Sequence, residues 1–298
     1  MVQILPEVAI QKDIQKRAQK TLLSSVSYSG IGIHTGHEVH ITFHPAKEGT
    51  GICFRRVDLP SHPIIPATFE YVFDTSRSTN IKIGNAKIYT IEHLLAALRA
   101  YEIDNLMIDI SGIEPPACNG SSDVFVDLIE QAGVHTQSGS VPICSLKSPV
   151  FHSEGDIHLV AIPDTEYRIS YTLQYPKSPA LGTQFYSFVL SQEGFKKEIA
   201  PCRTFALYDE LSFLMDKGLI QGGSLDNAVV IKDKVIISKN GLFFRDEMVR
   251  HKILDLIGDL SLVGMPFLAH IIAIRSGHST NFAFAKKLFA HLSEEEVT

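Results

Sequence analysis

The sequence predicts an α+β protein of two similar domains, each a layered β-sheet/helix sandwich, with a cleft between them. The chain has 298 residues, and at about 150 residues per domain this length favours two domains. In each half, strand-like runs come first and helical patterns follow, so strands and helices occur in blocks. A polar stretch rich in Ser, Gly and Pro, HTQSGSVP at residues 135–142, lies between the halves and is the best candidate for a linker.

These patterns divide the chain into three parts. Residues 1–20 are interpreted as an N-terminal extension, either a leader or a short helix, and no chemistry is assigned to them. Residues 21–137 form the first α+β domain and residues 143–298 the second. The order of elements recurs between the two domains, but no repeat is visible at the level of single residues.

Composition excludes several classes of protein. With 45% hydrophobic and 20% charged residues, the chain is neither disordered, collagen-like nor a disulfide-stapled miniprotein. A net charge of −6 provides no basic surface, so we expect no nucleic-acid partner. No apolar run approaches the roughly 20 residues that span a bilayer, and the N-terminus is too polar for a signal peptide. We therefore expect a soluble, cytoplasmic protein.

The cysteines point away from thiolate chemistry. The four cysteines are far apart and form no C-x-x-C pair, so reduced thiols are expected. A metal site would therefore use histidine and carboxylate ligands, and the chain has 13 histidines.

The first half reads as strands followed by two helices. Alternating apolar and polar residues between Gly, Pro and Asn turns indicate the strands. The strand candidates are EVHITFHP, GICFRRVDL, KIYTI and NLMIDIS, and the helices cover residues 90–101 and 121–132.

The second half repeats this order. Its strand candidates are HLVAIP, YRISYTL and FYSFVL, and its helices lie near residues 205–217, 246–263 and 280–292.

The helix at 90–101 carries the first candidate site residues. Thr90 is placed to cap it, and its apolar stripe at i, i+3, i+4 and i+7 consists of Ile91, Leu94, Leu95 and Leu98. His93 points away from this stripe and Glu92 lies on the flank. On this segment alone, a solvated His and Glu on a surface helix is the favoured interpretation.

The helix at 246–263 carries the strongest pattern. Its core stripe consists of Val249, Ile253, Leu256, Ile257 and Leu260. His251, Asp255 and Asp259 line the opposite side at i, i+4 and i+8. A His and an Asp four residues apart on a helix can reach one ion together. His93 could add a third ligand from the other half, although H-x-x-x-D is also a common accident.

Two further histidine patterns are weaker. His278 follows Gly277 just before a helix, a position that often carries function but is more often structural. Four histidines cluster in HTGHEVHITFH at residues 34–44. They fit a polar, exposed strand face better than a second metal site, which we do not predict.

Taken together, six motifs resemble the UDP-3-O-acyl-N-acetylglucosamine deacetylases. They are GIGIHTG at 30–36, TIEHLLAAL at 90–98, RTF at 203–205, GGSLDNA at 222–228, VRHKILDLIGDL at 249–260 and SGH at 276–278. The similarity runs in order from about residue 21 to residue 290. Enzymes of this family remove acetate from the glucosamine nitrogen of UDP-3-O-(3-hydroxyacyl)-N-acetylglucosamine, the committed step of lipid A synthesis in Gram-negative bacteria.

The resemblance implies a zinc amidohydrolase with its site between two similar domains. His93, His251 and Asp255 match the zinc ligands, Fe²⁺ being an alternative ion. Three protein ligands leave a fourth position for water, as in catalytic zinc sites.

The resemblance also assigns the remaining roles. Glu92 matches the general base, and His278 matches the residue that stabilises the oxyanion or acts as the acid. Asp259 would orient His278, while Thr204 and Lys252 would lie around the tetrahedral intermediate or the substrate.

By the same similarity, an insertion near residues 205–235 forms an apolar passage for the acyl chain. Its candidate lining residues are Phe205, Phe213, Leu214, Leu219 and Ile220. Burying acyl methylenes at roughly 0.8 kcal/mol each would make a long chain a major determinant of binding. The expected partner is the UDP-linked acylated amino sugar. A monomer with peripheral contact to the inner membrane is expected.

The sequence departs from the family pattern at Asn119, where an Asp is usual. This places the local turn in doubt and leaves the zinc ligands untouched. The chain also lacks the dehydratase domain fused to some relatives, so we expect a single activity.

Two alternatives to the deacetylase are considered. A metal-free 3-hydroxyacyl dehydratase would use a His and a Glu but leaves the stripe of His251, Asp255 and Asp259 unexplained. A non-catalytic nucleotide-sugar or lipid binding protein would keep the pocket without the metal.

Overall fold

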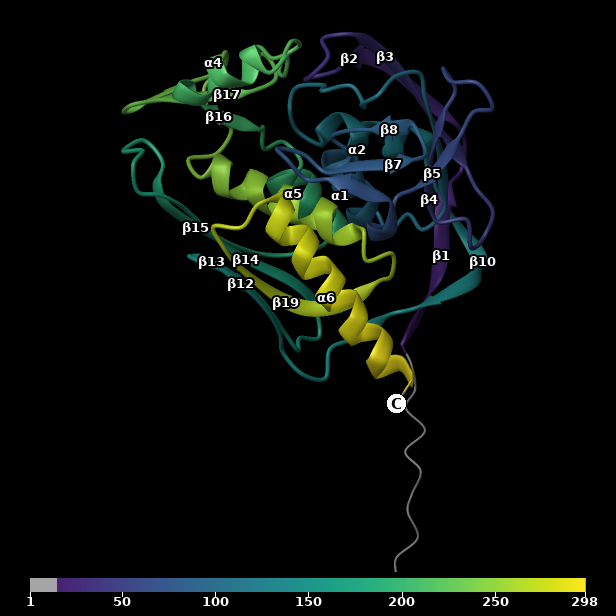
Figure 1. Cartoon of the computed structure of the whole chain (residues 1–298). Helices are drawn as coiled ribbons and strands as arrows, with labels where there is room; N and C mark the ends of the chain where they lie inside the picture. Colours follow the sequence, from purple (N-terminus) through teal and green to yellow (C-terminus); the bar gives the residue numbers. More distant parts are fainter. Residues whose placement is uncertain (1–14, 298) are drawn as a thin grey trace, which may run out of the picture.

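The computed structural model describes residues 15–297, which fold into two larger β-sheets with helices between them (Figure 1). The helices are α1 (Glu92–Ala100), α2 (Asp123–Ala132), α3 (Gln192–Gly194), α4 (Tyr208–Asp216), α5 (Glu247–Ser261) and α6 (His278–Val297). A 3₁₀ turn, η1 (Phe69–Tyr71), and a π-helical turn, η2 (Phe195–Ile199), complete the helical elements. The predicted α+β class is confirmed.

The first sheet has five strands in the order β2-β3-β9-β4-β5. All of its neighbours are antiparallel except β4 and β9, which are parallel. The strands are β2 (Val26–Ile31), β3 (Glu38–Pro45), β4 (Ile52–Arg56), β5 (Ile64–Pro66) and β9 (Leu106–Ile110).

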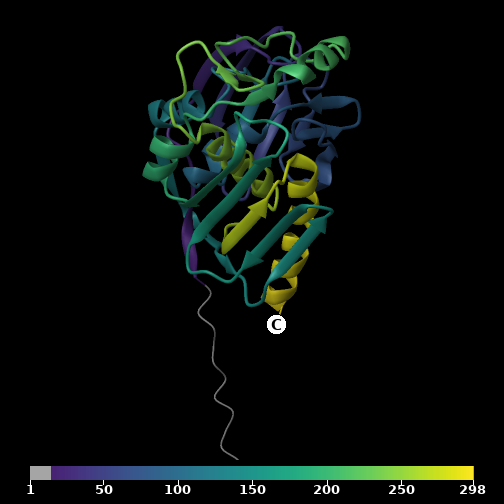
Figure 2. The same ribbon diagram turned by 90° about the vertical axis from the view of Figure 1, so that its left-hand side faces the viewer.

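The second sheet repeats this arrangement in the order β12-β13-β19-β14-β15. Here β14 and β19 are the parallel pair, and β11 (Cys144–Ser145) pairs with the end of β19. Figure 2 looks onto this sheet, with the helices behind it. Its strands are β12 (Val150–Glu154), β13 (Ile157–Ile162), β14 (Tyr167–Tyr175), β15 (Gly182–Val189) and β19 (Phe267–Ile274).

In each sheet the central strand is the last of the five in the chain, and one helix precedes it while another follows. Thus α1 and α2 flank β9 in sequence, and α5 and α6 flank β19. The recurrence predicted from the order of elements is therefore present as a repeated strand order.

Two three-stranded sheets and one two-stranded ribbon accompany the larger sheets. The first consists of β6 (Val72–Asp74), β7 (Asn80–Ile83) and β8 (Ala86–Ile88). The second consists of β16 (Phe205–Leu207), β17 (Val229–Lys232) and β18 (Val235–Ile237), and it stands with α4 away from the two larger sheets (Figure 1). The helix predicted near 205–217 thus begins later, at Tyr208, because Phe205 pairs with Val229.

The prediction for the chain start and the linker was wrong in one respect. Residues 16–22 form strand β1 (Lys16–Leu22), which pairs antiparallel with β10 (Val134–Pro142), the segment predicted as a linker. Both strands are polar because most of the ribbon is exposed or half-buried, so their composition resembles a loop. The remaining residues of the predicted extension, 1–14, lie outside the described part.

The two helices α1 and α5 pack against each other at very short distance. A Cβ on Gly258 would lie 2.1 Å from the carbonyl oxygen of Glu92 and 2.9 Å from its Cα. Both contacts are with backbone atoms, which cannot rotate away. The missing side chain of Gly258 is therefore what allows α1 and α5 to meet at this point.

Thr90 does not cap α1 as predicted. The residue has a φ of 56°, and the helix begins one residue after Ile91, with no side-chain cap. The carbonyl of Thr79 instead accepts a hydrogen bond from the Ile91 N–H.

Among the described residues, no helix combines the length and the hydrophobicity that a membrane span requires.

The close contact of α1 and α5 predicts a large effect of one added methyl group. Replacing Gly by Ala in a helix interior normally stabilises by roughly 0.5–1 kcal/mol. Gly258→Ala is expected to do the opposite and to cost about 1–3 kcal/mol through overpacking. Thermal unfolding followed by circular dichroism measures this.

The matched control is Gly277→Ala, whose added Cβ would meet nothing within 4 Å. This variant should unfold near the wild-type temperature. A Gly258→Ala protein as stable as the wild type would contradict the packing argument.

Candidate active site

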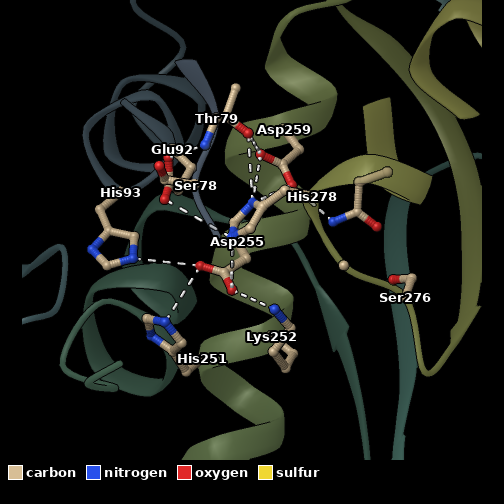
Figure 3. Close-up of polar contacts among 12 residues, drawn as sticks. Ser78, Thr79, Glu92, His93, His251, Lys252, Asp255, Asp259, Ser276 and His278 are labelled. Atoms are coloured by element: carbon tan, nitrogen blue, oxygen red, sulfur yellow. Dashed lines mark hydrogen bonds and ion pairs between the residues drawn. The ribbon is translucent and has the colours of Figure 1, made fainter. Parts of the chain in front are cut away.

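Three helices bring the predicted site residues together (Figure 3). The first turn of α1 supplies Glu92 and His93, and the buried side of α5 supplies three residues of its polar stripe. His278 is the first residue of α6. The polar stripe of α5 is thus not on the surface but lies under α1, where it consists of His251, Asp255 and Asp259.

His93, His251 and Asp255 form a cluster suited to one metal ion. The Nε2 atoms of His93 and His251 lie 3.4 and 3.3 Å from Oδ1 of Asp255. All three ligand atoms lie within 4.8 Å of one another. Two ligands about 2.0–2.1 Å from a tetrahedral ion are roughly 3.3 Å apart, which these separations to Asp255 match.

Asp255 provides the test of whether a cation fits. Its Oδ1 is buried and has no hydrogen-bond partner among the described residues. A buried carboxylate oxygen without a partner is costly, and a cation at this point would satisfy it. Burial alone would raise the pKa of Asp255, but the charge of the Lys252 ammonium outweighs burial and holds that pKa well below its usual range. The residues therefore fit a divalent ion.

His251 is held in the state of a metal ligand. Its Nδ1 lies 3.0 Å from the carbonyl oxygen of Cys202. A carbonyl can only accept, so Nδ1 carries the proton and the lone pair of Nε2 faces Asp255. Burial lowers the pKa of His251 to about 4, which keeps the ring neutral.

Glu92 is a buried carboxylate at the edge of this cluster. Its side chain is 3% exposed, and Oε2 accepts a hydrogen bond of 3.0 Å from the Thr79 N–H. Burial raises the pKa of Glu92, against the opposing effect of the charge on His278. Glu92 is therefore a stronger base than an exposed glutamate.

His278 and Asp259 form a buried pair opposite Glu92. Nδ1 of His278 lies 2.9 Å from Oδ2 of Asp259, and Nε2 lies 4.0 Å from Oε1 of Glu92. Burial by itself would lower the pKa of His278. The carboxylates of Asp259 and Glu92 outweigh it and raise this pKa to about 9. His278 thus presents a protonated Nε2 toward the site.

A largely apolar cavity of about 430 Å³ opens at the cluster. Glu92, His93, His251, Asp255 and His278 line its polar end. The other walls come from α4, β16 and the loops around residues 33 and 220. Of the predicted passage and intermediate-binding residues, those that line the cavity are Thr204, Phe205, Leu214 and Ile220.

Phe213 and Leu219 lie outside this cavity. Leu211, Leu214 and Met215 line it from one face of α4, and at 100° per residue Phe213 points to another side. Phe213 is 57% exposed, and the Lys217 ammonium lies over its ring.

Leu219 follows α4 and lines a different cavity of about 410 Å³. The sequence alone does not show where α4 begins and ends, so it could not show which of its side chains point into the apolar cavity.

Lys252 lies on the other side of the site. Its Nζ is 2.7 Å from Oδ2 of Asp255, and it lines a second cavity of about 670 Å³ beside His278. Lys177 and Arg275 line the same cavity. Thr204 and Lys252 therefore face two different spaces, both of which are lined by His278.

The structure adds two residues that the sequence did not indicate. Thr79 and Asn281 both donate hydrogen bonds to Asp259, at 2.5 and 2.8 Å. Thr79 lies outside the helical patterns and Asn281 lies within the helix predicted near 280–292, but neither residue type has a spacing rule that would single it out.

The histidine-rich strand has a structural explanation. His40 contacts Ser29, and His44 contacts Asp109. Across the described residues, the only His, Cys, Asp and Glu cluster suited to an ion is the one at His93.

Asn119 also has a local role. Its Oδ1 accepts hydrogen bonds from the N–H and the hydroxyl of Ser121, and its Nδ2 donates a hydrogen bond of 2.8 Å to Asp123. An Asp at this position could not donate the last of these hydrogen bonds. The turn before α2 is thus built around the amide.

Glu92 and Glu114 allow a prediction of how much a buried, ionised carboxylate changes the free energy of unfolding. Because burial raises the pKa of Glu92, a neutral isostere should be more stable than the ion. In chelator-treated protein, Glu92→Gln is expected to stabilise by about 1 kcal/mol. Chemical denaturation measures the difference.

Glu114 is the matched control. It is also buried, but it accepts hydrogen bonds from the N–H groups of His34 and Thr35 and from the Thr35 hydroxyl. Glu114→Gln should therefore destabilise by about 1–3 kcal/mol. Destabilisation of both variants to the same extent would contradict the interpretation of Glu92.

Comparison with known proteins identifies the family of this chain. The UDP-3-O-acyl N-acetylglycosamine deacetylase family pattern matches residues 19–290. The UDP-3-O-acyl-N-acetylglucosamine deacetylase of Chlamydia caviae is 56% identical over 273 residues, covering 92% of this chain and 97% of the relative. That of Chlamydia felis is 55% identical, covering 93% and 99%. That of Chlamydia trachomatis serovar L2 is 51% identical, covering 94% and 98%. The chain therefore belongs to the UDP-3-O-acyl N-acetylglycosamine deacetylase family.

Proposed function

We propose that this chain is a zinc-dependent deacetylase that hydrolyses the N-acetyl group of UDP-3-O-(3-hydroxyacyl)-N-acetylglucosamine. The products are acetate and UDP-3-O-acyl-glucosamine, and the step belongs to lipid A biosynthesis. The observation that carries the proposal is the unpartnered, buried Oδ1 of Asp255 beside His93 and His251, at the inner end of an apolar cavity. Family membership supports the same activity.

Zinc suits the two imidazoles and one carboxylate, and Fe²⁺ is the alternative ion for this ligand set. When bound, zinc would act as a Lewis acid that lowers the pKa of water toward about 7 and polarises the amide carbonyl. His93, His251 and Asp255 would hold the ion. Lys252 keeps Asp255 ionised, and the Cys202 carbonyl keeps the lone pair of His251 directed at the site.

Glu92 would act as the general base. It would take a proton from the water molecule as the oxygen attacks the acetyl carbonyl carbon. Its burial supports this role, because the raised pKa increases its proton affinity. The Thr79 N–H binds only one of its oxygens in the described structure, and Oε1 lies toward His278.

His278 would supply positive charge on the opposite side. As an imidazolium it would stabilise the oxyanion of the tetrahedral intermediate, and Asp259 would hold it charged. The C–N bond then breaks, and the leaving nitrogen takes a proton from Glu92 or His278. The reaction consumes one water molecule and yields acetate and the free amine.

The two cavities fit the two ends of the substrate. The apolar cavity with Phe205, Leu214 and Ile220 would take the acyl chain, at roughly 0.8 kcal/mol for each buried methylene. The cavity with Lys177, Lys252 and Arg275 would take the negatively charged UDP. Thr204, near the junction, would donate its hydroxyl to the substrate or to the intermediate.

The remaining proposals concern organisation. We infer that residues 21–137 and 143–298 form two domains, with the insertion near 205–235 in the second, and the repeated strand order supports this division. We also infer a cytoplasmic monomer that touches the inner membrane peripherally. Light scattering and cell fractionation test these two properties.

Removing a ligand should remove the ion and the activity together. Wild-type protein is expected to contain about one zinc per chain, and His251→Ala well under half of that. Acetate release from the UDP-linked substrate should fall at least 10³-fold in the same samples, since three ligands are needed for a catalytic zinc site. Elemental analysis and the acetate assay are the measurements. An active wild type without metal would overturn the mechanism.

Glu92→Ala separates a hydrolase from a binding protein. The zinc content should stay near the wild-type value, because Glu92 is not among the three ligands. Turnover should fall about 10²- to 10⁴-fold through loss of the base. If deacetylation proceeds at the wild-type rate in this variant, Glu92 does not have the proposed role.

A further inference from the structure

Thr79 lies between the start of α1 and the last turn of α5, with no exposed surface (Figure 3). All three of its polar groups are used at the site. Its N–H donates to Oε2 of Glu92 at 3.0 Å, and its carbonyl accepts from the Ile91 N–H at 3.2 Å. Its hydroxyl donates to Oδ1 of Asp259 at 2.5 Å. One residue thus contacts both sides of the proposed acid–base machinery.

The backbone of Thr79 holds the start of α1. This helix has no side-chain cap, so its first N–H groups need other partners. The Thr79 carbonyl accepts one of them, from Ile91, directly before Glu92. The Thr79 N–H in turn fixes the Glu92 carboxylate. The position of Glu92 therefore follows the position of Thr79.

The hydroxyl of Thr79 sets the orientation of Asp259. Asp259 is fully buried and accepts from three groups: Thr79 at Oδ1, Asn281 at Oδ2, and Nδ1 of His278. The first two hold the carboxylate plane so that Oδ2 faces His278 at 2.9 Å. Without the Thr79 hydroxyl, Oδ1 keeps only a 3.2 Å contact with His278. The carboxylate could then turn, and the imidazole with it.

We propose that Thr79 is a positioning residue, whose hydroxyl holds the Asp259–His278 pair in register with the Glu92 carboxylate bound to the same residue's N–H. This inference rests on the proposed deacetylase function. Threonine is needed for the hydroxyl alone, because valine would fill the same buried volume and keep the N–H. The contribution of the hydroxyl can therefore be isolated.

The test compares Thr79→Val with Thr79→Ser in purified, zinc-loaded protein. Removal of a hydrogen bond that orients a functional group typically costs 10- to 100-fold. Thr79→Val is expected to lower kcat by about that factor, with KM within about twofold and unchanged zinc content. Thr79→Ser, which retains the hydroxyl, should recover kcat to within about threefold.

Thr21→Val is the matched control for loss of a buried hydroxyl. Thr21 lies on strand β1 and is 3% exposed. Its hydroxyl donates a hydrogen bond of 2.6 Å to the Asn105 carbonyl. Its removal should lower the unfolding temperature and leave kcat unchanged. An equal loss of kcat in Thr21→Val would mean that Thr79→Val acts through stability, which would overturn the proposal.

A double-mutant cycle adds a readout that a structural role would not move. In a His278→Ala background, Thr79→Val should have little further effect on kcat, because the group it positions is absent. The same 10- to 100-fold loss in both backgrounds would show that Thr79 does not act through His278, and the proposal would fail. If Thr79→Val does not fold, Thr79→Ala removes the hydroxyl without adding a methyl group and serves in the same cycle.

The outcomes also separate this inference from the function. A folded, zinc-loaded wild type that releases no acetate from the UDP-linked substrate would refute the deacetylase assignment. A wild type that releases acetate, with Thr79→Val at the wild-type kcat, would refute the positioning role alone.

Discussion

The contact between α1 and α5 fixes the distances on which the rest of the site depends. Gly258 lies directly against the backbone of Glu92, where a Cβ would overlap the carbonyl oxygen. Helices approach this closely only where one of them lacks a side chain. The candidate metal ligands come from both helices, with His93 on one and His251 and Asp255 on the other. The packing distance between α1 and α5 therefore also sets the distances between the candidate metal ligands.

The site is a cluster of buried charges whose balance differs from one group to the next. Asp255 has the Lys252 ammonium 2.7 Å away and stays ionised. Asp259 has three donors and keeps His278 protonated. Glu92 has one backbone N–H, and its pKa rises as a result of burial. Burying a charge is unfavourable unless it is paired, and Glu92, the least compensated carboxylate, is one whose pKa burial raises.

Helical periodicity was sufficient to predict which polar side chains of α5 lie on one side of the helix. His251 and Asp255 are local neighbours whose spacing follows from the helix itself. The position of Thr79 could not be predicted, because its contacts depend on how a loop fits between two helices. Similarity to the family places the acyl passage near 205–235, and hydrophobicity selects Phe213 within it. Only the observed start of α4 shows which face of that helix points inward. The ribbon at 134–142 was missed because pairing partners distant in sequence override a polar composition.

The β1–β10 ribbon has a consequence for the order of events during synthesis. Leu22 pairs with Val134, and Lys16 with Pro142, so the first strand finds its partner only after the whole five-stranded sheet and α2 have been made. Closing so long a loop carries an entropic cost that local contacts do not. The segment at 16–22 leaves the ribosome before its partner strand has been made. We therefore expect it to be among the last parts of the first half to form its hydrogen bonds.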